Sequence, residues 1–393
     1  MVRVHRTFLT TAVAVCALGA TWALAGNVQK LDIVHGPYVQ AVTESSAVVV
    51  WFTNKPCVSR VEYGPEDSNE VTTAVASRHG LIDANTTVHK IPLTGLKAGI
   101  RYRYRVISTE IVQFDPYKVV YGDTITAGPY RVQTWSPQKD KFSFCVVNDI
   151  HEKADRLNSL LSQVSLDTTD MVFLNGDIVD HWTREDQVFG GFLDVCVRRF
   201  ARQTPFVYVR GNHETRGALA RNLIDWFPTP SREYYYAFRH GPVSFLVLDS
   251  GEDKPDSNAE YSGLVNFEPY MAEQTAWLRR AIQERSFKES RYRIALLHMP
   301  PVAKDEREYG SSRIYKLWAP LLNEANLDLT LCGHVHLYAR VDPNQSGCGF
   351  PILVNAPDTI VNIDVSDSQL DVTVKKVDGQ LVDQFAMKPR TQP

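Results

Sequence analysis

Apolar runs that end in Asp, Asn or His recur after residue 140 of this 393-residue chain, and they constrain its fold more than any other feature. The first two are Phe142 to Val147 before Asn148-Asp149-Ile150-His151, and Met171 to Leu174 before Asn175-Gly176-Asp177. Two more are Phe206 to Val209 before Arg210-Gly211-Asn212-His213-Glu214 and Ile294 to Leu297 before His298. The stretch Leu327 to Leu331, before Cys332-Gly333-His334-Val335-His336, alternates instead, with its three leucines on one face. Because ligands of open α/β sheets bind at the carboxyl ends of strands, the pattern predicts that these polar residues meet at one sheet edge.

Helical periodicity separates the apolar runs. We expect helices near Ala154 to Val164, Gln187 to Phe200 and Gln274 to Glu284, and a further strand at Val243 to Leu248. Strands that alternate with helices predict an α/β domain, which we place at residues 141–393. Its tail is expected to form a hairpin, Leu370 to Lys376 and Gln380 to Ala386, around Asp378-Gly379.

Residues 31–135 differ in composition from the later part of the chain, because their strand-like segments are rich in β-branched and aromatic residues. Strands are expected at Ala47 to Thr53, Ser59 to Tyr63, Val88 to Leu93 and Tyr102 to Val106, with turns at 54–56, 64–65 and 95–99. No helical period intervenes, which predicts an antiparallel β-sandwich of about 100 residues. The segment Leu96 to Tyr102 resembles the tyrosine corner of fibronectin type III domains. The exit from this domain is expected at Gly128-Pro129 to Pro137.

The first 25 residues have the pattern of a signal peptide. Arg3, His5 and Arg6 precede an apolar stretch from Phe8 to Ala25, which ends in Ala23-Leu24-Ala25, a small-x-small cleavage pattern. We expect a mature chain that begins near Gly26 and is exported to the periplasm or the extracellular space. The alternative is an uncleaved N-terminal membrane anchor, for which the stretch is of borderline length.

The composition is ordinary for a globular protein, with 44% apolar and 22% charged residues. The formal net charge of −3 argues against specific nucleic-acid binding, because no basic excess is present to neutralise phosphates. A small phosphorylated substrate remains compatible, since metal ions supply positive charge locally. Without Cys16, five scattered cysteines are left, and they contain no CxxC pair. We therefore predict neither a disulfide framework nor a zinc finger.

Seven side chains of the polar runs are candidate metal ligands. They are Asp149, His151, Asp177, Asn212, His298, His334 and His336. Imidazole together with carboxylate suits Fe, Mn, Zn or Co ions better than Ca or Mg. Seven ligands exceed the need of one tetrahedral site, whereas two divalent or trivalent ions that share a carboxylate would use them all. Two ions roughly 3.5–4 Å apart form the known clamp for in-line phosphoryl displacement.

The ordered motifs resemble the calcineurin-like metallophosphoesterases. They are Asp149-Ile150-His151, Gly176-Asp177-Ile178-Val179-Asp180, Gly211 to Glu214, His298 and Gly333 to His336. The preceding β-sandwich and the run Gly333 to Arg340 are similar to the purple acid phosphatase branch. This resemblance implies a four-layer αββα sandwich for the α/β domain.

The chain departs from the purple acid phosphatase branch at two places. That branch has D-x-G where this chain has His151, and G-D-x-x-Y where it has Asp180. The missing tyrosine puts an Fe(III)-containing metal pair in doubt. His151 is expected to fill the vacated coordination position, as the matching histidine does in the wider superfamily.

The resemblance also implies residue roles. Asp149, His151, Asp177 and His336 would hold the first metal, and Asp177, Asn212, His298 and His334 the second, with Asp177 bridging. His213 would act as general acid or stabilise charge on the phosphoryl group, and Asp149 would orient a metal-bridging hydroxide. His181 and Arg216, which adjoin the motifs, are expected to contact the substrate phosphate. Asp180 and Glu214 are expected to support the site by hydrogen bonds rather than to bind metal.

These features favour hydrolysis of a phosphomonoester by a metal-activated hydroxide. A phosphodiesterase of the same chemistry is the alternative, because the sequence does not define the pocket rim. A non-catalytic binding protein, in which the α/β domain is a degraded enzyme, is a second alternative. A degraded enzyme should have lost metal ligands, whereas the seven candidates and His213 are present. The polar stretch Gly251 to Met271 is expected to be either a substrate rim or a solvated face.

Overall fold

The computed structural model describes residues 29–302 and 308–389. The predicted signal peptide at residues 1–25 lies outside these described residues. Within them, no helix is both long enough and apolar enough to cross a membrane.

The strands between residues 33 and 133 pair in antiparallel fashion. They are β1 (Ile33–Gln40), β2 (Ser46–Pro65), β3 (Thr72–Ala74), β6 (Thr86–Thr94), β7 (Arg101–Asp115) and β8 (Lys118–Gln133), with a ribbon of β4 (Ser77–Arg78) and β5 (Leu81–Ile82). The first part of β2 pairs with β1 and β6 and the second part with β3 and β7, so the sheet folds over a core that contains Trp51 and Tyr104. The Tyr102 hydroxyl accepts a hydrogen bond from the Lys97 backbone N at 2.9 Å, which forms the expected tyrosine corner. The all-β prediction for this region is confirmed.

In this region one turn prediction is wrong, and the predicted exit from the domain begins too early. Asn54-Lys55-Pro56 lies inside β2, where the pairing with β6 shifts register between Phe52 and Cys57. Gly128-Pro129 lies inside β8, opposite a similar shift between Tyr104 and Val106 of β7. A proline has no N–H to donate to the ladder, and an irregularity in the pairing accommodates it without ending the strand.

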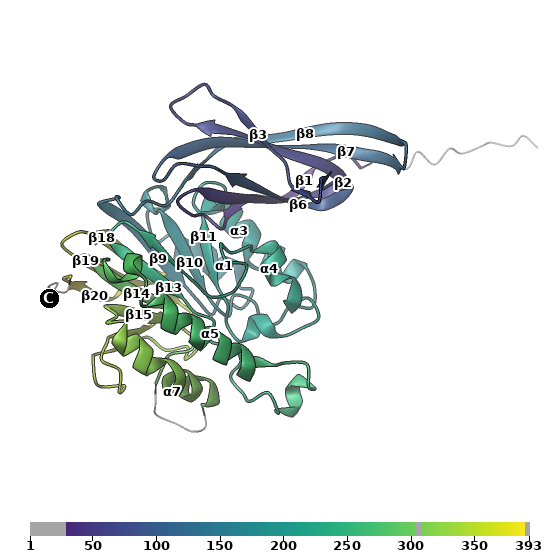
Figure 1. Cartoon of the computed structure of the whole chain (residues 1–393). Coiled ribbons are helices and arrows are strands. Elements are labelled where there is room, and N and C mark those ends of the chain that lie inside the picture. The colour runs from purple at the N-terminus through teal and green to yellow at the C-terminus, as the bar shows by residue number, and fades with distance from the viewer. Residues whose placement is uncertain (1–28, 303–307, 390–393) are drawn as a thin grey trace, which may run out of the picture. The chain divides into compact units, whose positions relative to one another are not determined.

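In the described residues after 140, two mixed sheets carry the predicted strands (Figure 1). Sheet I has the order β11 (Phe206–Val209), β10 (Met171–Asn175), β9 (Lys141–Val147), β18 (Thr359–Ser366), β19 (Leu370–Lys376), β20 (Leu381–Met387). Sheet II has the order β12 (Tyr236–His240), β13 (Val243–Val247), β14 (Tyr292–Leu296), β15 (Leu329–Cys332), β17 (Ile352–Val354), β16 (Ala339–Val341). The strands that precede the polar runs are parallel within each sheet: β9, β10 and β11 in sheet I, and β14 and β15 in sheet II. The predicted tail hairpin is confirmed as β19 and β20.

The alternation of side chains along each strand builds the layers. Phe144 of β9 faces sheet II, where its ring meets the ring of Phe245 at a centroid distance of 5.3 Å. Its neighbour Cys145 points the other way, into a cluster with the helices on the outer face of sheet I. A third apolar cluster, which includes Trp318, joins the outer face of sheet II to its helices. The predicted αββα order is thereby confirmed.

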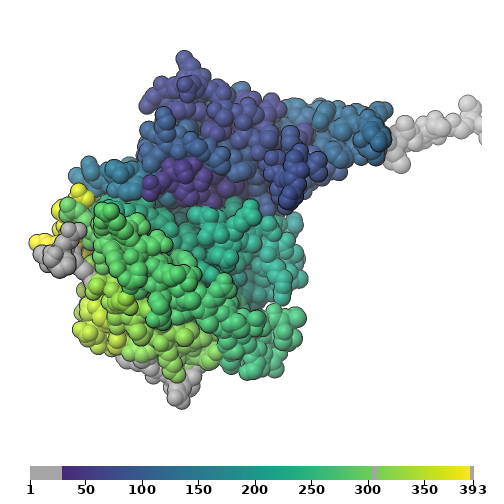
Figure 2. Space-filling view, in the orientation of Figure 1, coloured from purple at the N-terminus to yellow at the C-terminus, as the bar shows by residue number. Residues whose placement is uncertain are grey.

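Helices cover the outer face of each sheet. Sheet I is covered by α1 (Ala154–Leu161), by a continuous helical stretch that contains α2 (Asp186–Val188) and α3 (Asp194–Cys196), and by α4 (Leu223–Trp226). Sheet II is covered by α5 (Phe267–Ala281), α6 (Arg285–Lys288) and α7 (Tyr309–Glu324), and Figure 2 shows α5 and α7 in green on the molecular surface. Helix α7 was not predicted from the sequence, because its Gly310 and Pro320 weaken the local helical pattern. Helix α5 begins earlier than its periodicity indicates, since residues 267–271 form its first turns.

The cysteines of the described residues are buried and form no disulfide with one another. They are Cys57, Cys145, Cys196, Cys332 and Cys348. Burial raises the pKa of the Cys145 thiol to about 12, which makes it an apolar core side chain rather than a nucleophile.

Candidate metal centre

The polar runs of both sheets meet at the carboxyl ends of their strands. Backbone hydrogen bonds tie the loop after β9 to the loop after β10, from Asp149 N to Gly176 O at 2.9 Å and from His151 N to Asp177 O at 3.1 Å. The loops after β14 and β15 are joined by Gly333 N to His298 O at 2.8 Å. These short links bring residues that are far apart in the chain to one place, as the sequence pattern predicted.

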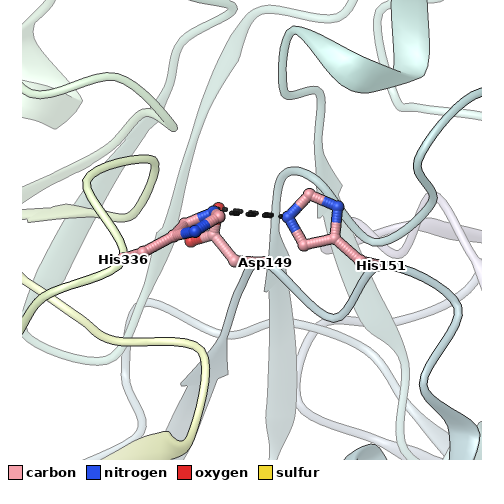
Figure 3. Close-up of side chains that lie close together, drawn as sticks. All are labelled: Asp149, His151 and His336. Carbon is pink, nitrogen blue, oxygen red and sulfur yellow. Dashed lines mark hydrogen bonds and ion pairs between the residues drawn. The ribbon is translucent and has the colours of Figure 1, made fainter.

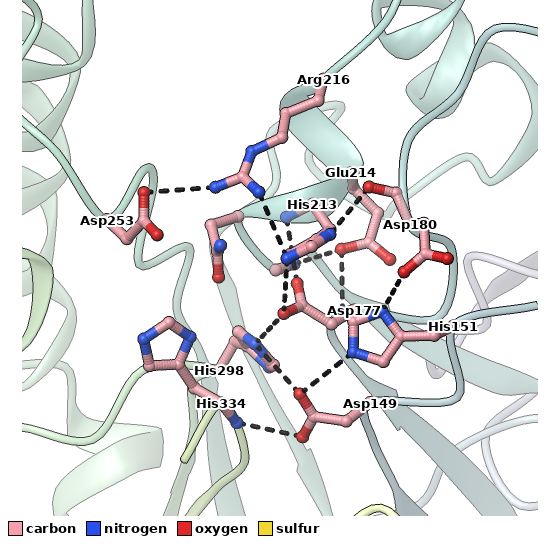
Figure 4. Close-up of polar contacts among 12 residues, drawn as sticks. Asp149, His151, Asp177, Asp180, His213, Glu214, Arg216, Asp253, His298 and His334 are labelled. Carbon is pink, nitrogen blue, oxygen red and sulfur yellow. Dashed lines mark hydrogen bonds and ion pairs between the residues drawn. The ribbon is translucent and has the colours of Figure 1, made fainter. Parts of the chain in front are cut away.

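Two contacts join the sheets at this place. The His298 Nδ1 atom donates to the Asn175 carbonyl at 2.8 Å, from sheet II to sheet I. The His334 backbone N donates to Asp149 Oδ2 at 3.0 Å (Figure 4). The centre therefore depends on how the two sheets pack as well as on each loop.

The six aspartate and histidine candidates fall into two clusters, in each of which the ligand atoms lie within 4.8 Å of one another, and a third such cluster joins His151 to Asp180 and His213. One cluster is Asp149, His151 and His336, in which Asp149 Oδ1 lies 3.1 Å from His336 Nε2 and 3.9 Å from His151 Nε2 (Figure 3). The other is Asp177, His298 and His334, in which His298 Nε2 lies 2.9 Å from Asp177 Oδ2 and 3.8 Å from Asp149 Oδ1. The structure thus brings these predicted ligands together.

The hydrogen-bond inventory of the buried ligands fits a metal. Among the described residues, the buried Asn212 Oδ1 accepts no hydrogen bond, and the buried Asp149 Oδ1 and His298 Nε2 face other candidate ligands, at 3.1 Å from His336 Nε2 and 2.9 Å from Asp177 Oδ2 respectively. The other polar atoms of Asp149 and His298 form hydrogen bonds, since Asp149 Oδ2 accepts from Asn148 Nδ2 at 2.5 Å and His298 Nδ1 donates to a carbonyl. Buried polar atoms are seldom left without a partner. In a metal-binding histidine, one ring nitrogen usually donates to a backbone carbonyl or carboxylate, and the other binds the metal. The imidazole, carboxylate and amide donors suit transition-metal ions.

The charges of the centre also favour a cation. Burial opposes the charged form of His298, yet the carboxylates of Asp177 and Asp149 raise the pKa of His298 to about 10. Burial likewise opposes ionisation of Asp177, but the His298 imidazole lowers the pKa of this carboxyl. A field that holds a proton on a fully buried imidazole attracts a metal cation for the same reason.

Several ligands adopt backbone conformations that L-residues avoid. Asp149, His151, Asp177, His334 and His336 have φ between 49° and 71°. The left-handed region costs roughly 1–2 kcal/mol for a residue with a side chain. Strain of this kind persists where the surrounding structure requires it, and it concentrates at functional sites.

Glycines allow the loops to approach the ligands closely. A Cβ atom at Gly176, which has φ of 84°, would lie 2.5 Å from the His298 ring. A Cβ at Gly333 would lie 2.7 Å from Asp149 Oδ2. Any larger residue would displace a ligand, which explains the glycines of the G-D and G-H-x-H motifs.

The buried Glu214 carboxylate holds two of the loops together. Glu214 Oε2 accepts from the backbone N of Asp177 and of Gly211, both at 2.9 Å, and Oε1 accepts from Ile178 N at 2.7 Å and Tyr208 Oη at 2.9 Å. The expectation that Glu214 supports the loop by hydrogen bonds is confirmed.

His213 belongs to neither of the two clusters that contain the candidate ligands, although it lies beside them. Its Nδ1 donates to the Asp180 carbonyl at 2.7 Å, and its Nε2 lies 3.2 Å from Arg216 Nη1 and 3.9 Å from Asp177 Oδ2 (Figure 4). Arg216 therefore reaches the centre. His181 is exposed and makes no hydrogen bond to any described residue, so the structure places only one of the two predicted substrate contacts at the centre.

The sequence left open the roles of two carboxylates in the polar loop from Gly251. Glu252 is fully buried and pairs with Arg216 at 3.0 Å, whereas Asp256 accepts from the backbone N of Phe267 at the start of α5. The polar loop that begins at Gly251 therefore has two roles: Glu252 lies beside the centre, and Asp256 caps the start of α5. No local pattern distinguishes these carboxylates, because their partners lie at a distance in the sequence.

The fold and the paired Asp, Asn and His clusters define a metallophosphoesterase architecture. The family model for calcineurin-like phosphoesterases matches residues 142–338, and the model for the N-terminal domain of purple acid phosphatases matches residues 35–120. The chain belongs to the calcineurin-like phosphoesterase family.

Related sequences and a solved structure agree with this assignment. Purple acid phosphatase 21 of Arabidopsis thaliana is 24% identical over 302 residues, which is 72% of this chain and 61% of the relative. Probable purple acid phosphatase 20 of the same plant is 26% identical over 254 residues, which is 59% of this chain and 55% of the relative. The chain therefore spans less than two thirds of the length of these relatives. The structure of purple acid phosphatase PPD1 from yellow lupin superposes with a TM-score of 0.64 at 15% identity, over 90% of this chain and 74% of that one, which shows a shared fold.

Proposed function

We propose that this chain is a metal-dependent phosphoester hydrolase, and that phosphomonoesters are its substrates. The observation that carries the proposal is that the buried atoms Asp149 Oδ1, Asn212 Oδ1 and His298 Nε2 have no polar partner outside the candidate ligands of the two clusters. The similarity to purple acid phosphatases supports the same chemistry.

The proposed ligand sets follow the two clusters. Asp149, His151, Asp177 and His336 would hold one ion, and Asp177, Asn212, His298 and His334 the other, with Asp177 shared. Fe, Mn, Zn or Co ions suit these donors. Bound there, such ions would polarise the phosphoryl group and activate water as the nucleophile.

The other side chains would orient the substrate and move protons. Because His213 Nδ1 donates to the Asp180 carbonyl, its Nε2 faces the centre. When both ring nitrogens are protonated, the imidazolium would give its Nε2 proton to the leaving oxygen, and we assign His213 this role. Asp149 would orient the attacking water through Oδ1. The displacement is a single step in which the new P–O bond forms opposite the bond that breaks. His181, on the exposed side of the loop, stays a prediction as a substrate contact.

Phosphodiester hydrolysis is the second candidate, and the charges at the rim favour it. Arg216 pairs with both Glu252, at 3.0 Å, and Asp253, at 3.2 Å. This part of the rim therefore has no excess of positive charge for the second negative charge of a monoester. A singly charged diester would meet less repulsion there.

Turnover of chromogenic esters tests the proposal. Purified protein should hydrolyse p-nitrophenyl phosphate, should lose this activity on chelation, and should regain it with at least one of Fe, Mn, Zn or Co. Faster hydrolysis of bis(p-nitrophenyl) phosphate under the same conditions would favour the diesterase. Inactivity toward both esters with each of these metals would contradict the proposal.

We also propose export and a two-domain organisation. The proposal of export, to the periplasm or the extracellular space, depends on the basic and apolar pattern of residues 1–25. The proposed division into residues 31–135 and 141–393 is supported by the strand boundaries, since β8 ends at Gln133 and β9 begins at Lys141. The expected partner is a small phosphorylated substrate.

A further inference from the structure

The Arg216 side chain is held on three sides next to the candidate metal centre. Its Nε lies 3.2 Å from Glu252 Oε1, and its Nη2 lies 3.0 Å from Glu252 Oε2 and 3.2 Å from Asp253 Oδ1. The remaining nitrogen, Nη1, lies 3.2 Å from His213 Nε2 (Figure 4). One end of the guanidinium is therefore fixed by carboxylates, and the other faces the proposed proton donor.

Glu252 is built into the structure as a buried anion. Its side chain is fully buried, and besides Arg216 it accepts hydrogen bonds from Thr215 Oγ1 and from Tyr261 Oη, the latter at 2.8 Å. Its backbone carbonyl accepts from Arg313 Nη2 of α7 at 2.9 Å. A carboxylate is costly to bury, and it persists here because each oxygen has more than one donor. Glu252 is thus more rigid than the surface carboxylates of the same loop.

The geometry of the pair restricts what Arg216 can do. A side-on bidentate pair with a carboxylate fixes the plane of the guanidinium and leaves Nη1 as the donor that points away from Glu252. Nη1 can only donate, and the neighbouring Nε2 of His213 lies 3.9 Å from Asp177 Oδ2 of the candidate centre. An oxygen bound at Nη1 would lie beside the candidate metal ligands, and it would meet a second donor at Nε2 when both nitrogens of the His213 ring are protonated.

We infer that Glu252 is a positioning residue that aims Arg216 Nη1 at an oxygen of the substrate phosphoryl group. The inference deepens the proposed function and rests on it, because it names how this rim holds the phosphoryl group. Glu252 neutralises the charge of Arg216, so the contact supplies direction and hydrogen bonding rather than net attraction. Loss of the Glu252 charge should therefore weaken phosphate binding, although it makes the rim more positive.

The test compares metal-loaded wild-type protein with E252Q and R216K. Binding of inorganic phosphate is measured by calorimetry, and KM and kcat are measured with p-nitrophenyl phosphate. Both variants should bind phosphate roughly tenfold more weakly, which corresponds to the loss of one charge-assisted hydrogen bond. Metal content, measured by mass spectrometry, should stay at the wild-type level, because neither residue is a proposed ligand.

D249N is the matched control. Asp249 is also a fully buried carboxylate that pairs with an arginine, but its partner Arg210 stacks on Tyr234, with 3.9 Å from the guanidinium carbon to the ring centroid. D249N should keep the phosphate affinity of the wild type, whereas a general effect of losing a buried carboxylate would weaken all the variants alike.

Each outcome of the binding experiment supports or contradicts the inference. Phosphate affinity at or above the wild-type level in E252Q, or at the wild-type level in R216K, overturns the inference. If E252Q fails to fold, R216K alone decides, because it keeps the charge and removes only the fork geometry. A wild-type protein that binds phosphate without turning over either ester contradicts the proposed function, while the binding comparison still tests the positioning of Arg216.

Discussion

The Nδ1 atom of His151 lies 2.6 Å from Oδ1 of Asp180, three residues beyond Asp177, the proposed shared ligand. A carboxylate accepts this hydrogen bond from the ring, so the His151 Nε2 lone pair faces Asp149 and His336. The backbone carbonyl of Asp180 also accepts a hydrogen bond from His213 Nδ1. Asp180 therefore sets the orientation of a candidate ligand and of the candidate proton donor at once.

Removal of the Asp180 carboxylate should weaken metal binding. In D180A the His151 ring loses the partner that fixes its tautomer, and the metal affinity should fall about 10- to 100-fold, as for other supporting carboxylates. D180N should lose less, because its amide oxygen can still accept from Nδ1. Competition with a chelator, followed by metal analysis, measures the affinity. D186N is the control, since Asp186 is an exposed carboxylate paired with Arg184. Unchanged affinity in D180A would contradict this role.

Introducing a side chain at Gly176 should displace His298. The Cβ of G176A would lie 2.5 Å from the His298 ring, in a backbone conformation with φ of 84°. We expect lower stability, by about 1–3 kcal/mol from strain alone, together with loss of bound metal. G263A is the control, because Gly263 also has positive φ, at 71°, but a Cβ there contacts nothing within 4 Å. Urea unfolding and metal analysis separate the effects, and a G176A protein that keeps its full metal content would refute the proposed crowding.

Chelation should lower the melting temperature of the protein. Without bound cations, the carboxylates of Asp149 and Asp177 repel each other in a buried site, and a ligand that binds only the folded state stabilises it by about 4 kcal/mol at 1,000 times its Kd. Thermal unfolding with and without chelator measures the shift. H298A should show a much smaller shift, because it lacks a ligand to one proposed ion. Equal melting temperatures for chelated and metal-loaded wild-type protein would argue against a folded-state metal site.

Acid should destabilise the fold through His240. This side chain is buried between Trp135 and Phe142, and burial, with a further contribution from Lys139, lowers the pKa of His240 to about 3 from an ordinary value of 6.5. Between these values the unfolded chain binds the proton and the folded chain does not, so stability falls as the pH falls from about 7. The loss between pH 7 and pH 5 is about 2 kcal/mol from this residue.

H240N provides the comparison for this pH dependence. Asparagine can place its oxygen where His240 Nδ1 accepts from the Ser136 backbone N at 3.1 Å, but it does not titrate. The variant is expected to be less stable at pH 7 and to lose about 2 kcal/mol less on acidification. Urea unfolding at both pH values measures the difference, and identical pH slopes for the two proteins would show that His240 does not contribute.

Local sequence was enough to predict most strands of both sheets and the chemical types at their ends. A run such as Met171 to Leu174 is a strand whatever its neighbours are, and Asn175-Gly176-Asp177 must follow at its carboxyl end. The order of the motifs also predicted the αββα architecture, through resemblance to a known family. Local pattern failed at Asn54-Lys55-Pro56, where a shift in strand register absorbs the proline, and at α7, where packing of Ile314 and Trp318 offsets an internal Pro320.

Only the tertiary structure decided which atoms of the candidate ligands stay free. Asp149 uses Oδ2 for partners from two loops and leaves Oδ1 directed at the imidazoles of other candidate ligands, a distinction that no property of the residue itself contains. The same holds for Glu252, whose pairing with Arg216 and Tyr261 converts an ordinary polar loop residue into a buried anion. Residue type and strand position are local properties of a sequence, whereas burial and hydrogen bonding depend on segments that meet only when the two sheets pack together.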